Sequence, residues 1–250
     1  MLDLTVITVV KNDSQNILNT VNSVLKQKNC KFEYIICDGN SSDTTANRLK
    51  KYNSKKINFF RQRDKNLYDA INKCIIKSKG NYIFLIHSGD VFCDDFVLQK
   101  IQKQLIKNPD LISGNIKYFK KYNNRNLVTR IWKSPIKNFN KFSVFKIPHT
   151  SMVIKKKIIK KINYYNTSYN ISGDMDFMIK LSQLKKINYI YLNSYFVFML
   201  SDGLSTSRKN FFKKLIQDFK ILIENYGFNF LIYYFFKIYF KVFQYLRLKH

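Results

Sequence analysis

The sequence predicts an α/β fold in which helices flank a mostly parallel central sheet. Short apolar runs rich in β-branched residues alternate with stretches of helical periodicity, and several runs end in a polar cluster. Strands buried on both faces give such continuous apolar runs, and their alternation with helices is typical of parallel strands joined by crossover helices. At 250 residues, 46% of them hydrophobic, the chain can form one large α/β domain or at most two small ones.

The first hundred residues supply the regular part of this pattern. Strands are predicted at residues 4–10, 32–37, 57–61 and 82–86. Helical spacing of apolar residues predicts helices over 17–25, 44–52 and 67–79, and Gly80 is placed to stop the third. Polar clusters follow three strands, at 11–14, 38–43 and 88–90. Because ligands bind beyond the carboxyl ends of parallel strands, we expect these clusters to converge on one crevice.

The rest of the chain is less regular. Strands are predicted at 111–118, 151–154 and 189–200, with helices at 174–184 and 211–226. The dense aromatic run 228–248 contains Lys237 and Lys241, which argue against a membrane-spanning helix. They favour a helix that lies in the interface with its lysines toward anionic headgroups. The alternative is a helix that packs onto the rest of the chain or onto a second subunit.

The formal net charge of +28 suggests an anionic partner, such as nucleic acid, an acidic membrane surface or an anionic substrate. The competing interpretation is a genomic bias toward residues with AT-rich codons, which leaves lysines on a solvated surface. Four cysteines without a Cys-x-x-Cys pair, and only three histidines, argue against a zinc site. The chain opens on a strand-like run with no signal-peptide pattern, so we expect a reducing, cytoplasmic location.

Asp90 stands at the end of the fourth predicted strand, and Gly89 before it permits close approach of a ligand. A carboxylate there can hold Mg²⁺ or Mn²⁺, hard cations that need few protein carboxylates when phosphate oxygens and water complete the shell. The alternative is a turn or a helix cap, where aspartate is common.

Three further acidic positions have a functional and a structural interpretation. Asp38 can accept hydrogen bonds from a base N–H or from ribose, or it can belong to an Asp-Gly turn. The segment Asp64–Lys73 can position a diphosphate or ribose, or it can be an ordinary solvated helix start. Asp174 can act as general base on an acceptor hydroxyl, or it can cap its helix.

The order and spacing of these pieces resemble family 2 of the inverting glycosyltransferases, which have the GT-A fold. Residues 7–12 (Ile-Thr-Val-Val-Lys-Asn) match its Thr-Val-x-x-Asn pattern, and residues 38–45 match Asp-Gly-x-Ser-x-Asp-x-Thr. Residues 64–74 match Asp-x-Gly-Ile-Tyr-Asp-Ala-x-Asn-Lys-Gly, which is characteristic of the bacterial branch that builds surface polysaccharides, with colanic-acid-type transferases as relatives. Residues 87–90 (His-Ser-Gly-Asp) match the metal motif of the family.

The resemblance extends to about residue 210. Pro148-His149 is similar to a Pro/Cys-His-Gln segment, Asp174–Phe177 to Asp-Tyr-Asp-Leu, and residues 201–205 to a Gly-Gly-x-Ser turn. It implies a GT-A catalytic domain over 1–210, with a nucleotide-sugar-binding half at 1–100 and an acceptor-binding half at 101–210. Amphipathic, membrane-associating helices would follow at 211–250.

The resemblance also implies roles for individual residues. Asp90 would hold Mn²⁺ or Mg²⁺ against the diphosphate, Asp174 would be the catalytic base supported by Asp176, and His149 would line the acceptor side. Residues of the four N-terminal motifs would contact the donor: Thr8, Val9, Asn12, Asp38, Asp64, Tyr68, Asp69, Asn72, Ser88 and Gly89. The chain departs from the family pattern at Asn66, Cys74, His87 and Thr150, and its metal motif has one Asp instead of two.

The implied activity is a single in-line displacement with inversion. The donor would be a nucleotide-diphosphate sugar, with UDP as the expected nucleotide, and the acceptor a saccharide or lipid-linked saccharide at the inner face of the cytoplasmic membrane. Two alternatives come from other classes. A nucleotidyltransferase is expected to have a Gly-rich phosphate loop near the first strand, and residues 9–14 contain no glycine. A nucleic-acid-binding protein would want a basic face, and the lysines are scattered, so no nucleic-acid partner is expected.

Overall fold

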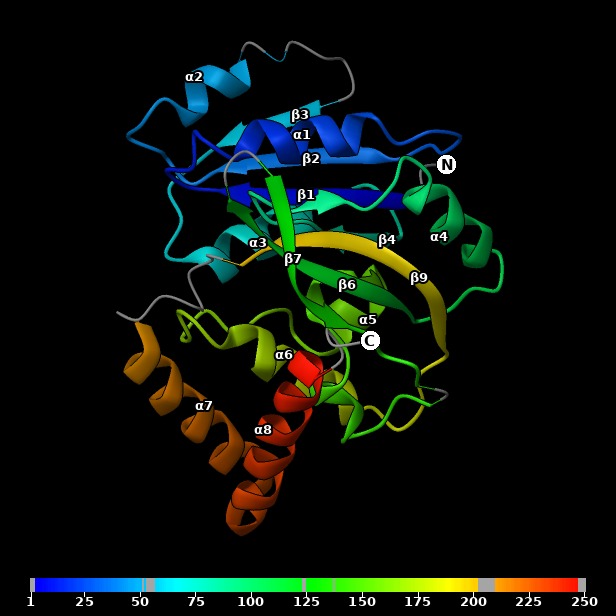
Figure 1. Cartoon of the computed structure of the whole chain (residues 1–250), viewed down its shortest axis with the longest axis vertical. Helices are drawn as coiled ribbons and strands as arrows, with labels where there is room; N and C mark the ends of the chain where they lie inside the picture. Colours follow the sequence, from blue (N-terminus) through cyan, green and yellow to red (C-terminus); the bar gives the residue numbers. More distant parts are fainter. Residues whose placement is uncertain are drawn as a thin grey trace.

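The computed structural model describes residues 3–50, 52, 57–122, 125–136, 138–201 and 210–246. Figure 1 shows a central sheet with helices on both faces and two C-terminal helices, α7 and α8, that project away from the sheet as a V. The described strands form one sheet of nine strands in the order β3-β2-β1-β4-β8-β6-β9-β5, with β7 paired to β6. The predicted α/β fold class is confirmed.

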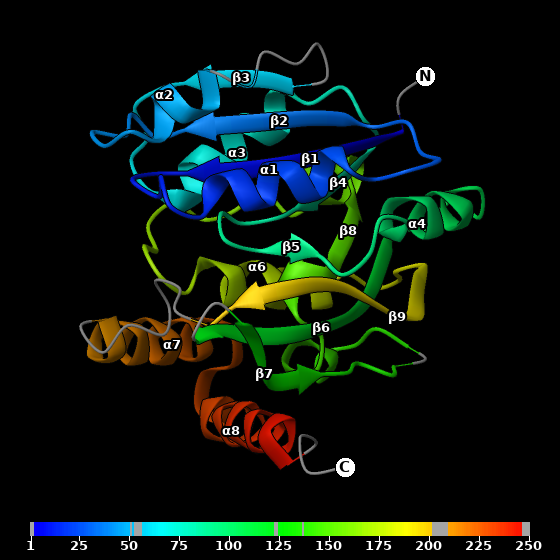
Figure 2. The ribbon, with the colours of Figure 1, turned by 45° about the horizontal axis from the view of Figure 1, so that its top comes forward.

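Strands and helices alternate over the first hundred residues, as predicted. They are β1 (Leu4–Val10), α1 (Ile17–Leu25), β2 (Glu33–Asp38), α2 (Thr45–Lys50), β3 (Ile57–Arg61), α3 (Leu67–Lys77) and β4 (Tyr82–Leu85). The strands β3, β2, β1 and β4 pair in parallel, and Figure 2 shows the first three side by side. One detail differs from the prediction. Helix α3 ends at Lys77 with Ser78 as its C-cap, whereas Gly80 packs so close to β1 that a Cβ there would lie 2.6 Å from Thr5 Oγ1.

The second half of the sheet is mixed in direction. Its elements are β5 (Val91–Phe92), α4 (Val97–Leu105), β6 (Leu111–Tyr122), β7 (Arg125–Trp132), β8 (Met152–Lys155), α5 (Lys156–Lys161), α6 (Gly173–Ser182) and β9 (Tyr189–Leu200), with short 3₁₀ helices η1 (Ser143–Phe145) and η2 (His149–Ser151). Strand β8 runs antiparallel to β4 and β6, and β6 runs parallel to β9. The three strands and the helix predicted here are confirmed; β5, β7, α4 and α5 had not been predicted.

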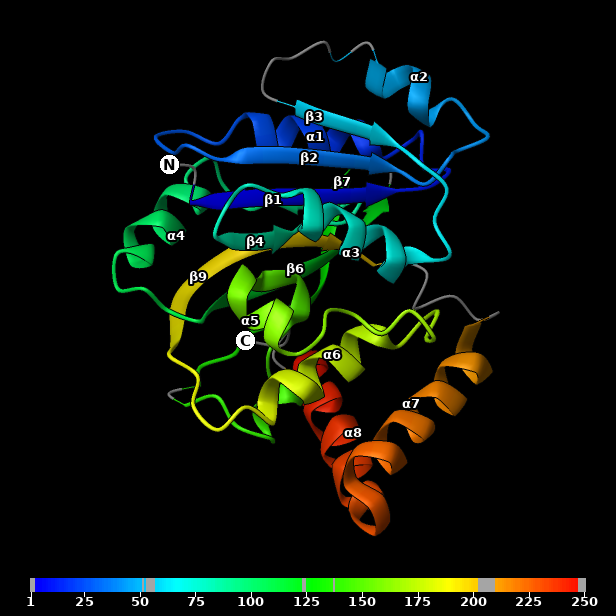
Figure 3. The same ribbon diagram turned by 180° about the vertical axis from the view of Figure 1, so that it is seen from behind.

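Separate apolar cores cover the two faces of the sheet. On one face, Val21 of α1 and Leu98 of α4 are buried with Phe84 of the sheet. On the other face, Ile71 of α3 and Phe177 of α6 belong to the second core. Figures 2 and 3 show α1 and α3 on opposite sides of the strands. Because both faces are covered, the open positions for a ligand are the strand ends and the loops that follow them.

The chain ends in a helical hairpin made of α7 (Phe211–Tyr226), the 3₁₀ turn η5 (Gly227–Asn229) and α8 (Phe230–Leu246). We call residues 211–246 the C-terminal hairpin. Stacked rings join its two helices, including Tyr226 on Tyr233 at 3.5 Å between centroids. Ile221 and Leu222 of α7 are fully buried in the core that contains α6. Within the described part of the chain, no helix has both the length and the apolar character that crossing a bilayer requires.

Candidate active site

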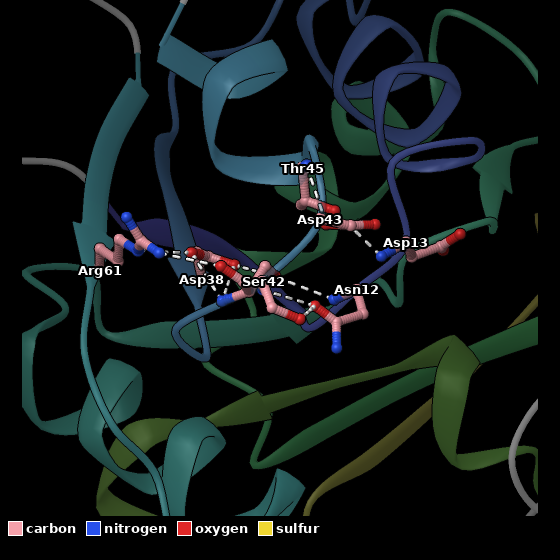
Figure 4. Close-up of polar contacts among 8 residues, drawn as sticks. Asn12, Asp13, Asp38, Ser42, Asp43, Thr45 and Arg61 are labelled. Atoms are coloured by element: carbon pink, nitrogen blue, oxygen red, sulfur yellow. Dashed lines mark hydrogen bonds and ion pairs between the residues drawn. The ribbon is translucent and has the colours of Figure 1, made fainter.

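The loops that follow β1 and β2 are joined by a network of hydrogen bonds (Figure 4). Asn12 has φ 52°, a left-handed conformation that asparagine tolerates better than most residues. Its Oδ1 accepts a hydrogen bond from the N–H of Ser42 at 2.8 Å, and its own N–H donates to Ser41 Oγ at 2.8 Å. The N–H of Asp13 donates to Thr45 Oγ1 at 3.0 Å. Two of the predicted polar clusters therefore meet at the carboxyl ends of their strands.

Asp38 lies fully buried under this network. Its carboxylate accepts hydrogen bonds from the hydroxyl and the N–H of Ser41, and Arg61 Nε lies 3.2 Å from its Oδ2. Arg61 also donates to the Ser41 carbonyl at 2.9 Å. The contacts of Asp38 thus fix the shape of the loop. Its predicted contact with a nucleotide base stays a prediction.

The third polar cluster joins the first one. Ser88 Oγ donates to Asp13 Oδ2 at 2.7 Å. Gly89 has φ 94°, and a Cβ there would lie 3.0 Å from the Leu200 side chain, so glycine is the residue this turn requires. The Gly89 N–H donates to Thr20 Oγ1 of α1 at 2.9 Å. The predicted convergence of the three clusters is therefore confirmed, and Asp90 is held at their meeting point.

Asp90 is only 3% exposed. Its Oδ1 accepts a hydrogen bond from the N–H of Leu200 at 2.9 Å, and its Oδ2 is buried with no hydrogen-bond partner among the described residues. Burial raises the pKa of Asp90 from 3.8 to about 8, although the Leu200 hydrogen bond acts in the opposite direction. A buried carboxylate oxygen without a partner is the kind of group that a cation satisfies.

No group of three or more His, Cys, Asp or Glu side chains able to hold a metal occurs in the described part of the chain. A single carboxylate still suits Mg²⁺ or Mn²⁺, because these cations take further ligands from substrate phosphates and water. The free Oδ2 of Asp90 fits that role.

A charged cluster lies at the start of α3. Lys73 Nζ is 2.9 Å from Asp64 Oδ1 and 2.8 Å from Asp69 Oδ2. Asn66 caps the helix, since its Oδ1 accepts hydrogen bonds from the N–H groups of Tyr68 and Asp69, both at 3.1 Å. Asp64 Oδ2 is buried and has no partner among the described residues. Asp64 thus keeps one buried acceptor whose hydrogen-bonding capacity is unused among the described residues.

Asp174 lies in the first turn of α6 and contacts two residues predicted for the site. Its Oδ2 is 3.3 Å from His149 Nδ1, and its Oδ1 is 3.3 Å from the Tyr68 hydroxyl. The same hydroxyl donates to the Ile171 carbonyl at 2.7 Å. The side chain of Asp174 is 35% exposed, so an incoming hydroxyl group can reach it. The structure therefore brings together Asp174, His149 and Tyr68, which are far apart in the sequence.

The charges around Asp174 favour its ionised form. Burial by itself raises the pKa of Asp174, but His149, Lys214 and Lys237 outweigh it and hold the pKa below its usual value. The ring of His87 lies 5.9 Å from that of His149. Burial, with the charge of His149, lowers the pKa of His87 to about 4, so His87 is neutral at pH 7. Asp174 is thus a carboxylate ready to accept a proton.

Several predicted site residues have their side chains engaged within the protein. The Thr8 hydroxyl is fully buried, 3.0 Å from that of Tyr34. Asn72 donates to the Tyr165 carbonyl at 2.8 Å and accepts from the Tyr165 N–H at 3.0 Å. Val9 packs against the core that contains α3. These three side chains have contacts within the protein, and their predicted contacts with the donor stay predictions.

Asp176 is buried and pairs with Lys180, one turn along α6, at 2.8 Å. Its predicted role as support for Asp174 stays a prediction. Of the predicted turn at 201–205, Ser201 is described, and Asp202–Ser205 lie outside the described residues. Sequence reasoning missed the contacts of Asp13 and Arg61, because both depend on pairing between loops that only the fold brings together.

The family model described as "Glycosyl transferase family 2" matches residues 5–163. A glycosyltransferase of Mycobacterium tuberculosis is 27% identical over 195 residues, which span 71% of this chain and 68% of that protein. The Escherichia coli enzyme UDP-Glc:alpha-D-GlcNAc-diphosphoundecaprenol beta-1,3-glucosyltransferase WfgD is 24% identical over 222 residues, 86% of this chain and 84% of that enzyme.

Solved structures have the same fold. TarS from S. aureus in complex with UDP-GlcNAc gives a TM-score of 0.70 at 15% identity, covering 90% of this chain and 68% of that one. The mannosyltransferase PcManGT from Pyrobaculum calidifontis, in complex with GDP-Man and Mn²⁺, gives 0.59 at 13% identity, covering 89% and 62%. At these identities the likeness concerns the fold, and it confirms the predicted GT-A-like arrangement.

Proposed function

The chain belongs to glycosyl transferase family 2, and we propose that it transfers a sugar from a UDP-sugar to a hydroxyl group of a saccharide or lipid-linked saccharide. The observation that carries the proposal is a pair of aspartates, Asp90 after β4 and Asp174 in the first turn of α6. Asp174 is half-exposed and ionised, and Asp90 is buried with one free oxygen. The first suits a base and the second suits a ligand for a divalent cation.

In the proposed reaction, Asp174 takes the proton from the acceptor hydroxyl as that oxygen attacks the anomeric carbon of the donor. His149 Nδ1 lies 3.3 Å from one oxygen of this carboxylate and can orient it, whereas the Tyr68 hydroxyl lies 3.3 Å from the other and donates to the Ile171 carbonyl. A divalent cation bound by Asp90 would offset the negative charge on the departing nucleoside diphosphate. A single displacement with one base and no carboxylate nucleophile inverts the configuration at the anomeric carbon.

We place the donor against the loops after β1, β2 and β3. Asp64 Oδ2 has no partner among the described residues, and it is the acceptor we propose for a ribose hydroxyl. The relative WfgD is named for a UDP-Glc donor and a diphosphoundecaprenol-linked acceptor, and TarS was solved with UDP-GlcNAc. Both names support a UDP-sugar donor, and the first supports a lipid-linked acceptor. We therefore also propose a role in bacterial surface-polysaccharide synthesis, in the colanic-acid-type branch.

We also propose that the protein lies on the inner face of the cytoplasmic membrane, and the C-terminal hairpin supports this part of the proposal. The hairpin exposes many large apolar side chains, among them Phe212, Ile216, Phe228, Leu231, Ile232, Phe235, Ile238, Tyr239 and Val242. Exposed apolar side chains in such number are typical of a surface that contacts lipid or protein. Because the chain has a net charge of +28, we propose that anionic lipid contacts this surface of the hairpin.

One part of the membrane prediction is wrong. Lys237 does not face outward toward headgroups, because its ammonium group pairs with Asp218, a buried residue of α7. The outward stripe of α8 is apolar at Leu231, Phe235 and Ile238. We therefore propose that α8 enters the interface by this stripe, with the exposed Lys241 of α8 and charges elsewhere on the chain providing the attraction to anionic lipid.

Liposome sedimentation tests the membrane proposal. Replacing Leu231, Phe235 and Ile238 together by Ser should release the protein from vesicles that contain anionic lipid, because these side chains provide the apolar contact. The control carries the same change at exposed apolar residues outside the hairpin: Ile76, Phe96 and Ile106. If both triple variants bind the vesicles equally, the hairpin has another partner.

A thermal-shift assay with a panel of nucleotide-sugars, with and without Mn²⁺, tests the donor proposal. A ligand that binds only the folded state raises the unfolding midpoint, so the true donor should do so more strongly when Mn²⁺ is present. We expect a UDP-sugar to give the largest shift. A panel in which no nucleotide-sugar stabilises the chain, with or without Mn²⁺, would contradict the proposed function.

A further inference from the structure

The segment that leads into α6 is held by a residue of the C-terminal hairpin. Ser172 is the N-cap of α6, but its side chain makes no capping hydrogen bond and its Oγ is buried without a partner among the described residues. The N–H groups of Ile171 and Ser172 instead both donate to Gln217 Oε1 of α7, each at 3.1 Å. Two backbone donors, three and two residues before Asp174, are therefore satisfied from outside α6.

The opposite side of the same segment rests on α3. The Tyr68 hydroxyl donates to the Ile171 carbonyl at 2.7 Å, and a Cβ on Gly173 would lie 2.7 Å from the Tyr68 ring. Figure 3 shows α6 between α3 and the two hairpin helices. Residues 171–173 thus contact both Tyr68 of α3 and Gln217 of α7. Asp174 is the next residue along the chain.

Two further contacts join the hairpin to residues that flank Asp174. The Tyr169 hydroxyl donates to Glu224 Oε2 of α7 at 2.6 Å. Lys237 of α8 pairs with Asp218 and lies 3.4 Å from Met175 Sδ. The hairpin therefore contacts the chain both before and after Asp174, which is more than a peripheral membrane attachment requires.

We propose that the C-terminal hairpin belongs to the catalytic machinery, with Gln217 as the positioning residue that fixes the backbone of Asp174. This inference rests on the proposed function, in which Asp174 is the base. Gln217 acts through the two N–H groups and touches neither substrate. A carboxylate displaced by about 1 Å can lose a hundredfold in rate, because proton transfer depends on distance and direction.

The test compares Gln217→Leu with Gln217→Glu in the full chain. Leu removes the acceptor, so we expect kcat to fall at least tenfold while KM and binding of the nucleotide-sugar donor stay within about twofold. Glu keeps an oxygen for the same two N–H groups, so it should restore most of kcat. A matched control is Gln183→Leu, because Gln183 also joins α6 to α7, through Asn225 at 3.1 Å, away from the base.

Hydrogen–deuterium exchange gives a readout that does not need activity. Amides in residues 171–176 should exchange faster in Gln217→Leu than in the wild type or in Gln183→Leu, because two of their hydrogen bonds are lost. If the wild type transfers no sugar, the proposed function fails whatever the exchange shows. Unchanged exchange, a kcat of Gln217→Leu equal to the wild type, or equal losses in Gln183→Leu and Gln217→Leu would each overturn the positioning role. If Gln217→Leu does not fold, the comparison is made with Gln217→Asn. This variant should have a lower kcat, because its acceptor oxygen is one methylene short of the two N–H groups. A wild-type kcat in Gln217→Asn would overturn the positioning role.

Discussion

Asp90→Asn is a nearly isosteric change that removes the ionisation of the carboxyl group and keeps an acceptor for the Leu200 N–H. In the folded chain, burial raises the pKa of Asp90 to about 8, against 3.8 for an ordinary aspartate. The folded state therefore binds a proton that the unfolded state releases between about pH 4 and 8. Because folded-state pKa exceeds unfolded-state pKa, this group contributes stability that is present at low pH and is lost as pH rises through that window.

The size of the effect follows from the pKa difference. Between pH 4.5 and 7.5 the wild type loses about 1.4 kcal/mol per pH unit from this group, or about 4 kcal/mol in all. For a chain of this length, 1 kcal/mol corresponds to about 2–4 °C in unfolding midpoint, so the loss is about 10 °C. Asp90→Asn should not show this loss, so relative to the wild type its midpoint should rise by about that amount over the same pH range.

The assay is thermal unfolding of both proteins in the presence of a chelator at pH 4.5, 6 and 7.5. All other titrating groups are shared, so they cancel in the difference between the two profiles. Adding Mn²⁺ at pH 7.5 should then stabilise the wild type and leave Asp90→Asn unchanged, because the cation replaces the proton on the carboxylate. Parallel pH profiles, or an equal response of both proteins to Mn²⁺, would refute the reasoning that Asp90 is a buried carboxylate poised for a cation.

Three further substitutions address the base and its surroundings. Asp174→Asn should keep donor binding, measured by calorimetry, and lose transfer; near-normal turnover would mean that another group is the base. His149 helps to hold the pKa of Asp174 low, and activity is lost as pH falls through that pKa. His149→Ala should therefore move the acid limb of the kcat–pH profile to higher pH. An unmoved limb would contradict this role of His149. Gly173→Ala places a Cβ 2.7 Å from the Tyr68 ring, so the free energy of unfolding, measured by chemical denaturation, should fall by about 1–3 kcal/mol and kcat should also fall. Wild-type values of both would exclude the close packing.

Much of the framework could be predicted because its signals are local. The apolar runs at 4–10 and 57–61 are strands with the predicted bounds. In the first of them, β-branched residues buried on both faces leave few alternatives. The meeting of the loops after β1, β2 and β4 followed from a rule of topology, because β1 pairs in parallel with both of the others.

The direction of single side chains was harder to predict. Thr8 lies in a matching motif, but the alternation of a strand turns its hydroxyl toward Tyr34 and the core. The predicted interfacial helix placed Lys237 outward, whereas Asp218, a buried residue of α7, attracts it inward. Neither partner can be identified without knowing which elements pack together.

The link from Gln217 to Ile171 and Ser172 had no signal in the sequence. Its partners are backbone N–H groups 45 and 46 residues away, which any acceptor at that position could satisfy. The same holds for Leu200, whose N–H is bound by Asp90 across 110 residues. Contacts from a side chain to distant backbone depend on tertiary packing, so they appear only with the structure.

Product analysis tests the central claim most directly. The full chain would be incubated with a panel of nucleotide-sugars, Mn²⁺ and a bacterial membrane extract as the source of acceptor, beside Asp174→Asn as control. We predict that one nucleotide-sugar is consumed, that nucleoside diphosphate and glycosylated product form in equal amounts, that the new linkage is inverted at the anomeric carbon, and that the control forms none. Retention of the anomeric configuration, or equal product from Asp174→Asn, would contradict a single displacement with Asp174 as the base.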